Sequence, residues 1–219
     1  MLFGITTDTG DAEGEVLARH SVEFGQTDLE AVLPRFRGPI SQIPPMYSAL
    51  KRDGKPLYEL ARQGIEVERA ARNVVIHELL LLELTGDRCR LRVKCSKGTY
   101  IRTLAEDIGK ALGCGAHLTA LRRTAVGSLR IDNAVTLDQL NALSDAERSA
   151  CLQPPDALLQ KLPAVYLDEQ TAARFCHGNP VSAEVAPGPC RVYDQNRLLG
   201  LGEADPDGQL RPRRLVVSG

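Results

Sequence analysis

The sequence predicts an α+β fold, with a mixed, mostly antiparallel sheet flanked by helices and a small β domain after it. The first observation is a hairpin pattern, because the apolar run Val74–Leu84 and the strictly alternating run Arg88–Cys95 flank the turn Gly86-Asp87. The second is a helical repeat of apolar residues that starts after Gly98 and stops at Gly113. The third is a glycine-rich C-terminal part with short β-runs, typical of a compact barrel. We expect domains at 1–160 and 161–219.

Short strands, polar turns and two helices precede the hairpin. A capping box at Thr27-Asp-Leu-Glu30 predicts a helix to about Phe36, and Pro56 at a first helical turn predicts a second helix to about Gln63. The turn Asp8–Gly14 is polar, but two of its positions lack the side-chain oxygens of a calcium loop. The remaining expected elements are strands at Leu2–Thr6, Glu15–Phe24 and, with alternating burial, Met46–Lys51.

Two more capped helices are expected after the hairpin and its helix. Thr136-Leu-Asp-Gln139 is a capping box for a helix to about Leu143, and Asp168 caps a helix over Glu169–Phe175. Between them, Ser144–Ala157 is expected to be mostly loop. The β-runs that complete the C-terminal domain are Cys190–Tyr193, Leu198–Glu203 and Leu215–Val217.

The composition is that of an ordinary globular protein of 219 residues, with a hydrophobic fraction of 43% and a charged fraction of 25%. The net charge is −1, so contact with a nucleic acid has to come from local basic patches. No apolar run reaches the ~20 residues of a membrane helix, and no signal peptide opens the sequence. The six cysteines form no Cys-x-x-Cys pair and the four histidines complete no zinc pattern, which favours a reducing, cytoplasmic setting without a metal.

The stretch Cys95–Arg102 joins the alternating strand to the helix that follows it. Lys97 and Arg102 are cations, and an arginine can pair bidentately with a carboxylate or a phosphate. Tyr100 can stack on a base and offers a hydroxyl. Polar groups at such junctions commonly meet a ligand, but the same residues also fit a strand end with solvated cations and a core tyrosine. The basic face of the preceding strand is expected to be solvated or paired with glutamates.

An ordered set of short motifs runs over nearly the whole chain. The motifs are Thr7-Asp-Thr-Gly-Asp-Ala-Glu-Gly14, Gln42-Ile-Pro-Pro-Met-Tyr-Ser-Ala-Leu-Lys51, Leu57-Tyr-Glu-Leu-Ala-Arg-Gln-Gly64, Cys95-Ser-Lys-Gly-Thr-Tyr-Ile-Arg102, Gly113-Cys-Gly-Ala-His-Leu118, Leu121-Arg-Arg123 and Pro212-Arg-Arg-Leu-Val-Val217. Each is moderately specific, and the ordered set is highly specific. In this order the chain resembles the bacterial tRNA pseudouridine synthase B (TruB) family.

The resemblance implies a sheet of the pseudouridine synthase type, a C-terminal PUA-like RNA-binding module, and isomerisation of a T-loop uridine of tRNA to pseudouridine-55. It implies no metal or organic cofactor. By the family's pattern the catalytic residues are Arg102 and Tyr100. Arg102 is the cation that ionises and aims a nucleophilic aspartate, and Tyr100 lines the uracil pocket with Leu121. The residues implied to bind the substrate are Asp11, Tyr47, Ser48, Lys51, Lys97, Leu121, Arg122, Arg123, Arg211, Arg213 and Arg214.

The family carries its aspartate in a Gly-x-Leu-Asp-Pro-x-Ala-x-Gly segment, which has no close match in these 219 residues. The expectation is therefore the C-terminal part of such an enzyme, inactive by itself. Asp11 and Asp107 are the acids expected nearest the cleft, and neither is expected to substitute. The alternative is a non-catalytic tRNA-binding module, and a guide-RNA-dependent relative of the dyskerin type is less expected. In each case we expect a monomer that binds tRNA and no membrane.

Overall fold

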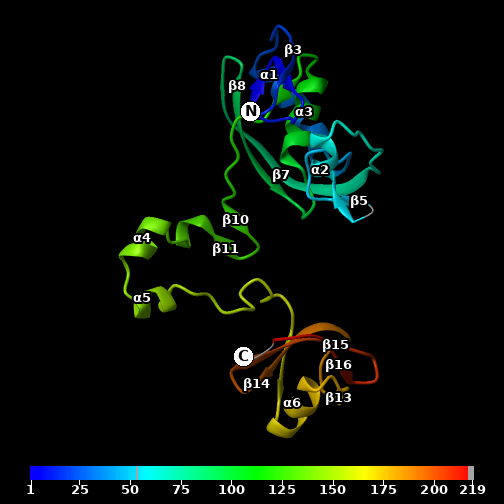
Figure 1. Cartoon of the computed structure of the whole chain (residues 1–219), viewed down its shortest axis with the longest axis vertical. Helices are drawn as coiled ribbons and strands as arrows, with labels where there is room; N and C mark the ends of the chain where they lie inside the picture. The colour runs from blue at the N-terminus through cyan, green and yellow to red at the C-terminus, as the bar shows by residue number, and fades with distance from the viewer. Residues whose placement is uncertain (53, 217–219) are drawn as a thin grey trace. The chain divides into compact units, whose positions relative to one another are not determined.

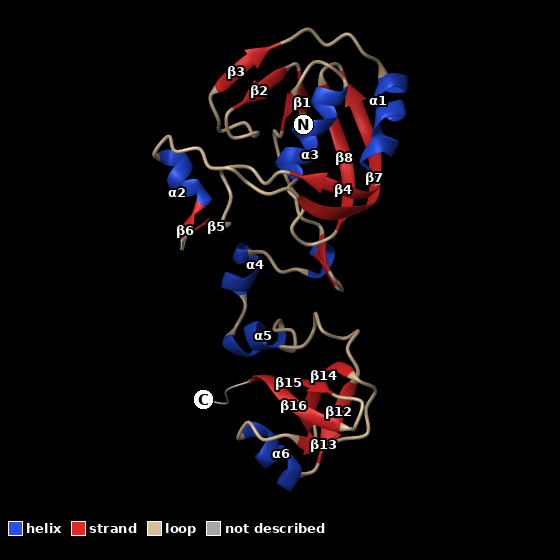
Figure 2. Ribbon diagram, turned by 90° about the vertical axis from the view of Figure 1, so that its right-hand side faces the viewer, coloured by secondary structure: helices blue, strands red, loops and turns tan. Residues whose placement is uncertain are grey.

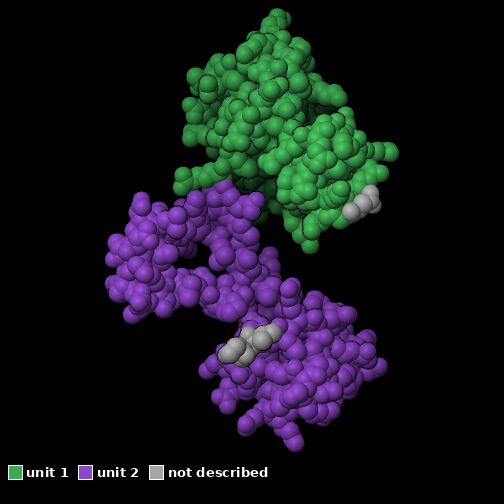
Figure 3. Space-filling model, in the orientation of Figure 1, with its two compact units in different colours: residues 1–122 green, residues 123–219 purple. Residues whose placement is uncertain are grey.

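The structure is a computed structural model, and it describes residues 1–52 and 54–216. The chain forms two compact units, Met1–Arg122 and Arg123–Gly219 (Figures 1 and 3). Val217, in the last predicted β-run, lies outside the described residues. The predicted domain boundary at residue 160 refers to the start of a domain that folds by itself. It stays a prediction.

The first unit is built on a five-stranded sheet with the strand order β4-β7-β8-β1-β9 (Figures 1 and 2). Every neighbouring pair is antiparallel, which confirms the predicted sheet type. The strands are β1 (Leu2–Phe3), β4 (Gly38–Gln42), β7 (Arg72–Thr85), β8 (Arg88–Cys95) and β9 (Ala116–His117). Beside the sheet lie two small ladders and a short helix, namely β2 (Ile5–Thr7) with β3 (Val16–Arg19), β5 (Lys51–Arg52) with β6 (Lys55–Pro56), and α2 (Leu57–Arg62).

The β7–β8 hairpin is the longest part of this sheet, and its prediction is confirmed. The ladder runs from Ile76 opposite Cys95 to Thr85 opposite Arg88. The register shifts at two places in β7, and such bulges increase the local twist of a strand. Both strands accordingly curve strongly (Figure 2). The basic residues of β8 lie exposed, as expected, and one of them forms an ion pair with a glutamate of β7.

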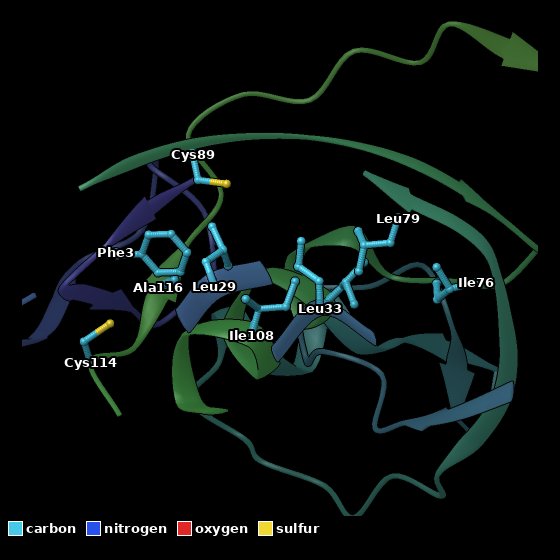
Figure 4. Packing of buried hydrophobic residues seen from close by; sticks show 10 residues of the cluster. Phe3, Leu29, Leu33, Ile76, Leu79, Cys89, Ile108, Cys114 and Ala116 are labelled. Atoms are coloured by element: carbon cyan, nitrogen blue, oxygen red, sulfur yellow. The ribbon is translucent and has the colours of Figure 1, made fainter. Parts of the chain in front are cut away.

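The hydrophobic core of the first unit lies inside the curve of this hairpin. Helix α1 (Gln26–Val32), the 3-10 turn η1 (Leu33–Phe36) and helix α3 (Ile101–Ala111) supply one side of it. Leu29, Leu33 and Ile108 from these helices pack in one cluster with Ile76 and Leu79 of β7, and all five are buried. Figure 4 shows these side chains pointing toward one another under the arch of the long strands. The core thus anchors α3 and the residues at its start.

Helix α3 begins at the junction that the sequence singled out. Gly98 has a φ of 83°, a left-handed conformation that side chains disfavour, and there the chain leaves the direction of β8. Tyr100 is the N-cap residue, and Arg102 is the second residue of the helix. The helix ends before Gly113, as predicted. The sequence therefore places Arg102 on the first turn of a well-anchored helix.

Three local predictions in this unit are wrong in detail. The carboxylate of Asp28 accepts the N–H of Gly25 at 2.8 Å, so Gly25, and not Thr27, caps α1. The strand expected over Glu15–Phe24 shrinks to β3, and the rest of the run is loop, although Val22 and Phe24 still pack against the core. Met46–Lys51 forms bends up to β5 instead of a strand, after the two prolines that precede it.

The second unit contains a curled mixed sheet with the strand order β12-β14-β15-β16-β13 (Figure 2). Strand β12 is parallel to β14, and the other pairs are antiparallel. This half-barrel confirms the predicted small β domain. The run expected at Leu215–Val217 was placed too late, because its strand ends at Leu215. The strands are β12 (Ala164–Leu167), β13 (Val181–Ser182), β14 (Gly188–Asp194), β15 (Arg197–Ala204) and β16 (Gln209–Leu215).

Helix α6 (Glu169–Cys176) covers one face of this second sheet. The carboxylate of Asp168 accepts the N–H of Thr171 at 2.8 Å, which confirms the predicted cap. Phe175 is fully buried and packs in one cluster with Val192 and Leu210.

The segment 123–155 differs from both sheets, because it buries none of its side chains. The capping box of Thr136 and Gln139 is confirmed. The loop expected over 144–157 is wrong, since Ser144 and Glu147 form a second capping box with the Ser144 N–H donating to Glu147 at 2.8 Å. The elements are β10 (Ala125–Val126), β11 (Leu129–Arg130), η2 (Ile131–Asn133), α4 (Leu137–Ala142) and α5 (Asp145–Ala150).

Candidate active site

The side chain of Arg102 reaches from α3 to two other segments of the first unit. Its Nη1 donates to the Asp11 carboxylate at 3.0 Å and to the Thr9 carbonyl at 3.1 Å. Its Nη2 donates to the Tyr47 carbonyl at 2.6 Å. Only 25% of the side chain is exposed. Three of the five N–H donors of the guanidinium are engaged, so its orientation is fixed, and its contacts with the described residues leave the other donors for a further anion.

Asp11 lies in the polar turn between β2 and β3, where the sequence placed it. One carboxylate oxygen accepts the Thr9 hydroxyl at 2.7 Å and the Glu13 N–H at 3.2 Å, and the other accepts Arg102. Partial burial acts to raise the pKa of Asp11, but these hydrogen bonds and the arginine charge outweigh it and hold the pKa below its ordinary value. Asp11 is therefore an ionised carboxylate bound to Arg102 at neutral pH.

The segment after the two prolines lies against the same arginine. Tyr47 contributes its backbone carbonyl to Arg102, and Ser48 beside it is buried, with 5% exposed. The Ser48 hydroxyl has no hydrogen-bond partner among the described residues. The structure thus brings Asp11, Tyr47 and Arg102 together, and their roles in substrate binding and catalysis stay predictions.

Gln42, to which the sequence analysis assigned no role, lies at the start of the same segment. It is the last residue of β4 and only 2% exposed. Its Oε1 accepts the N–H of Tyr100 at 3.0 Å, and its Nε2 donates to the Tyr100 carbonyl at 3.3 Å. These partners are 58 residues apart. A local sequence pattern cannot predict a contact between residues so far apart. The only local signal is a glutamine that ends a strand shortly before two prolines.

A second carboxylate near the arginine, that of Glu106, was also missed. Glu106 lies one turn after Arg102 on α3, so the two side chains share a face of the helix. A β-carbon added to Gly10 would lie 2.7 Å from its carboxylate, which places Glu106 against the turn of Asp11. Burial and the neighbouring Asp107 raise the pKa of Glu106, whereas Arg102 lowers it. Glu106, and not the expected Asp107, is therefore the second acid that interacts with the arginine.

The chain matches three sequence profiles of one family. The profile described as TruB family pseudouridylate synthase (N terminal domain) matches residues 1–101. The profiles described as tRNA pseudouridylate synthase B C-terminal domain and as Pseudouridine synthase II TruB, C-terminal match residues 102–160 and 163–216. The chain belongs to the TruB family. Its resemblance to the family, first seen in the ordered motifs, is confirmed.

Curated TruB relatives align with almost the whole chain. A tRNA pseudouridine synthase B of Dechloromonas aromatica (strain RCB) is 58% identical over 215 residues, covering 98% of this chain and 72% of the relative. One of Pseudomonas putida (strain GB-1) is 56% identical over 225 residues, covering 100% of this chain and 74% of the relative. Residues 1–101 match the family's N-terminal domain, so the expectation that the chain is only the C-terminal part of such an enzyme is corrected, while the Gly-x-Leu-Asp-Pro-x-Ala-x-Gly segment does not occur in the 219 residues.

Solved structures share the fold of this TruB-family chain. The "Crystal Structure of a Cbf5-Nop10-Gar1 Complex" matches with a TM-score of 0.64 and 27% identity, covering 83% of this chain and 56% of that chain. The "Crystal structure of the archaeal box H/ACA sRNP Nop10-Cbf5 complex" matches with a TM-score of 0.60 and 23% identity, covering 83% and 55%. The likeness confirms the pseudouridine synthase fold.

The other predicted site residues of the TruB-family chain lie at its surface. Leu121 has 62% of its area exposed, and Lys51, Lys97, Arg122 and Arg123 are exposed as well. Their contacts with RNA stay predictions.

The predicted basic patch of the second unit is partly neutralised. Arg211 pairs with Asp205 at 3.5 Å, and Arg213 pairs with Glu203 at 3.6 Å. Arg214 is exposed on the same strand. The patch thus offers less free positive charge than the sequence suggested.

The remaining features of this TruB-family chain concern metal ligands, membrane spans and cysteines. Within residues 1–52 and 54–216, no group of three or more potential ligands could hold a metal ion. In the same part of the chain, no helix is long and apolar enough to cross a membrane. The six cysteines are free thiols.

Proposed function

We propose that this chain acts in the isomerisation of a uridine in the T-loop of tRNA to pseudouridine-55. The observation that carries the proposal is the Arg102 guanidinium, which Asp11 and two backbone carbonyls orient while donors remain for another anion. The relatives named tRNA pseudouridine synthase B support tRNA as the substrate. The family's matching profiles support the reaction.

The proposed reaction conserves all atoms of the base. The bond from ribose C1′ to uracil N1 breaks, the uracil turns, and a bond from C1′ to C5 forms. The proton on C5 leaves and N1 gains a proton, so no oxidant or reductant takes part. A base inside a folded loop has to leave its stack for this chemistry. Tyr100, two residues before Arg102, is proposed to stack on the flipped uracil, which contributes about 1–3 kcal/mol.

The nucleophile of this reaction is proposed to be an aspartate that the 219 residues do not contain. Asp11 is bound to Arg102, and neither it nor Asp107 stands in the family's aspartate segment. The free donors of Arg102 suit a bidentate pair with such a carboxylate and would keep it ionised and aimed. We therefore propose that the 219 residues alone bind tRNA without turnover.

The second candidate is a non-catalytic tRNA-binding module. In both candidates residues 1–160 form the catalytic-type domain and residues 161–219 a PUA-like RNA-binding domain. Both are proposed to act as a cytoplasmic monomer.

The test uses two proteins and one RNA. The 219-residue chain, and the same chain extended at its N-terminus by a family segment with Gly-x-Leu-Asp-Pro-x-Ala-x-Gly, are each incubated with T-arm RNA. Pseudouridine is then mapped by mass spectrometry. We expect product from the extended chain and none from the 219 residues.

A matched control replaces the aspartate of the added segment by asparagine and should abolish product while retaining binding. Product from the 219 residues alone would overturn the proposal that they lack the nucleophile. An extended chain that binds T-arm RNA without turnover would favour the non-catalytic module. Failure of both proteins to bind the RNA would overturn both candidates.

A further inference from the structure

We propose that Gln42 is a positioning residue of the candidate active site, because its buried side-chain amide clamps the backbone of Tyr100 and so sets the start of α3 for RNA. This inference deepens the proposed function and rests on it for the identity of the ligand. Gln42 touches no reacting atom in this proposal and acts through Tyr100 and Arg102.

The clamp consists of two hydrogen bonds between one side chain and one residue's backbone. Tyr100 is the N-cap of α3, and no side chain of its own provides a cap. Its N–H is accepted by Gln42 Oε1 at 3.0 Å. Its carbonyl accepts the first helical N–H, from Leu104 at 3.0 Å, and also Gln42 Nε2 at 3.3 Å. A neutral amide with one acceptor and one donor is the group that satisfies both sides of this peptide.

The anchor of the clamp is rigid. Gln42 ends β4 and pairs in the ladder with Arg72 at the start of β7, so its backbone is held by the sheet. At 2% exposure its amide is shielded from water, and a hydrogen bond lost there leaves a backbone group unsatisfied. The sheet therefore fixes the position of the Tyr100 backbone through Gln42, in addition to the helix that Tyr100 caps.

The same segment holds the start of α3 at a second point. Five residues after Gln42, the Tyr47 carbonyl accepts Arg102 at 2.6 Å. Residues 42–47 therefore fix both the Tyr100 backbone and the Arg102 guanidinium. Loss of the first contact frees the helix start, and the Arg102–Asp11 pair then loses its alignment. If Gln42 only filled space in the core, an apolar side chain of the same size would serve equally well.

The test exploits the amide chemistry with two variants of the 219-residue chain. Gln42→Met has a similar volume but neither hydrogen bond. Gln42→Glu keeps one donor and one acceptor only while its carboxyl is protonated, and burial raises the pKa of such a carboxyl. Gln170→Met, on exposed surface of α6, is the matched control. Affinity for T-arm RNA is measured from pH 5 to 8 relative to the unchanged chain, with unfolding followed in the same buffers.

We expect Gln42→Met to bind the RNA about tenfold more weakly at every pH, the size of one lost hydrogen-bonded contact. We expect the deficit of Gln42→Glu to be about tenfold at pH 8 and to shrink toward pH 5 as its carboxyl gains a proton. Folded Gln42→Met with unchanged affinity, or a pH-independent deficit of Gln42→Glu, would overturn the inference. A loss of affinity that only follows the folded fraction would also overturn it.

A second readout does not depend on RNA. Titration of the Asp11 carboxyl by NMR should show its pKa moving up toward the ordinary value in Gln42→Met, because Arg102 is no longer aligned with it. Hydrogen exchange of the Tyr100 amide should quicken in the same variant. If the unchanged chain failed to bind T-arm RNA, the proposed function would fall, while these two measurements would still decide the role of Gln42.

Discussion

Each unit of the molecule holds an arginine paired with an aspartate, and the two pairs differ in burial and in the closure of their networks. The side chains of Arg102 and Asp11 are 25% and 28% exposed, whereas those of Arg191 and Asp156 are 11% and 7% exposed. The ion-pair distances are similar, 3.0 Å and 2.7 Å. Distance alone therefore does not distinguish the two pairs.

The buried pair belongs to a closed network. One oxygen of Asp156 accepts Arg191, the Gln160 amide at 2.9 Å and the Tyr193 hydroxyl. Arg191 also donates to the Leu162 carbonyl at 3.1 Å, so the network ties residues 156–162 to β14. Hydrogen bonds from Tyr193 and Arg191 hold the pKa of Asp156 below its ordinary value.

The open pair is different in kind, because Arg102 uses backbone carbonyls for its other contacts and retains donors. A closed network stabilises the fold, and an open one is suited to a ligand.

The largest expected effect is on stability, from Asp156→Ala. Removing one partner of a buried ion pair leaves the arginine uncompensated, and we expect the second unit to lose about 3 kcal/mol of unfolding free energy. Urea unfolding with hydrogen exchange of β14 amides measures this. The matched control is Asp145→Ala, whose carboxylate is 99% exposed and whose loss should cost under about 1 kcal/mol. Equal losses from both variants would contradict the closed-network interpretation.

Arg102→Ala should lower the reaction rate strongly and the stability only moderately, unlike Asp156→Ala. We expect a stability loss of about 1–2 kcal/mol, because its contacts are partly exposed. In the extended chain with the aspartate segment, kcat should fall about 100-fold or more, and T-arm affinity should fall much less. Arg90→Ala, at an exposed ion pair, is the control and should leave kcat unchanged. A variant that loses affinity but keeps kcat would refute the orienting role.

Tyr193→Phe removes one hydroxyl from the closed network and should cost about 1 kcal/mol of stability. Tyr166→Phe is the control, because Tyr166 stacks on Tyr193 at 5.3 Å but is 67% exposed. Thermal unfolding of both variants gives the comparison. Both variants keep the stacked rings, so an equal or larger loss in the control would contradict a stabilising role for the Tyr193 hydroxyl.

The smallest expected effect is in the pH dependence of stability. The pKa of Asp11 is lowered by folding, so its contribution is present above the unfolded value of about 3.9 and is lost as pH falls through the folded pKa. Asp11→Asn should therefore be less stable than the unchanged chain near neutral pH, and the difference should shrink below about pH 4.

Asp107→Asn provides a control of opposite sign. Burial raises the pKa of Asp107, so its ionised form disfavours the fold at neutral pH and the asparagine variant should gain stability there. Denaturant midpoints from pH 2.5 to 7 measure both variants. Parallel curves for the two variants would contradict the assigned causes.

The parts of the fold that could be predicted are those that depend on local sequence patterns. The alternation of Arg88–Cys95 and the glycines around α3 located the hairpin and the helix that carries Arg102. Ser144 and Glu147 form the same kind of capping box as Thr136 and Gln139, so α5 could have been predicted from its local sequence as α4 was.

The parts that could not be predicted depend on contacts far apart in the chain. The Gln42 amide meets Tyr100 only after β4 has paired with β7, and Glu106 meets the turn of Asp11 only after α3 has packed on the sheet. Neither pair has a spacing that a helix or strand would impose. The ordered family motifs pointed to Arg102, Asp11 and Tyr47 as site residues, but they did not indicate which groups would hold Arg102 and Tyr100 in place.

The two-residue strand β1 has a consequence for the order in which the first unit folds. Leu2 lies between Arg88 of β8 and His117 of β9, so one interior strand of the sheet is made of residues that leave the ribosome long before their partners. The β7–β8 hairpin can form from neighbouring residues, whereas β1 needs the slower closure of long-range contacts, first with β8 and then with β9. We expect a nascent chain that ends before residue 116 to expose the edge of β1 that pairs with β9, and to need protection from aggregation until β9 emerges.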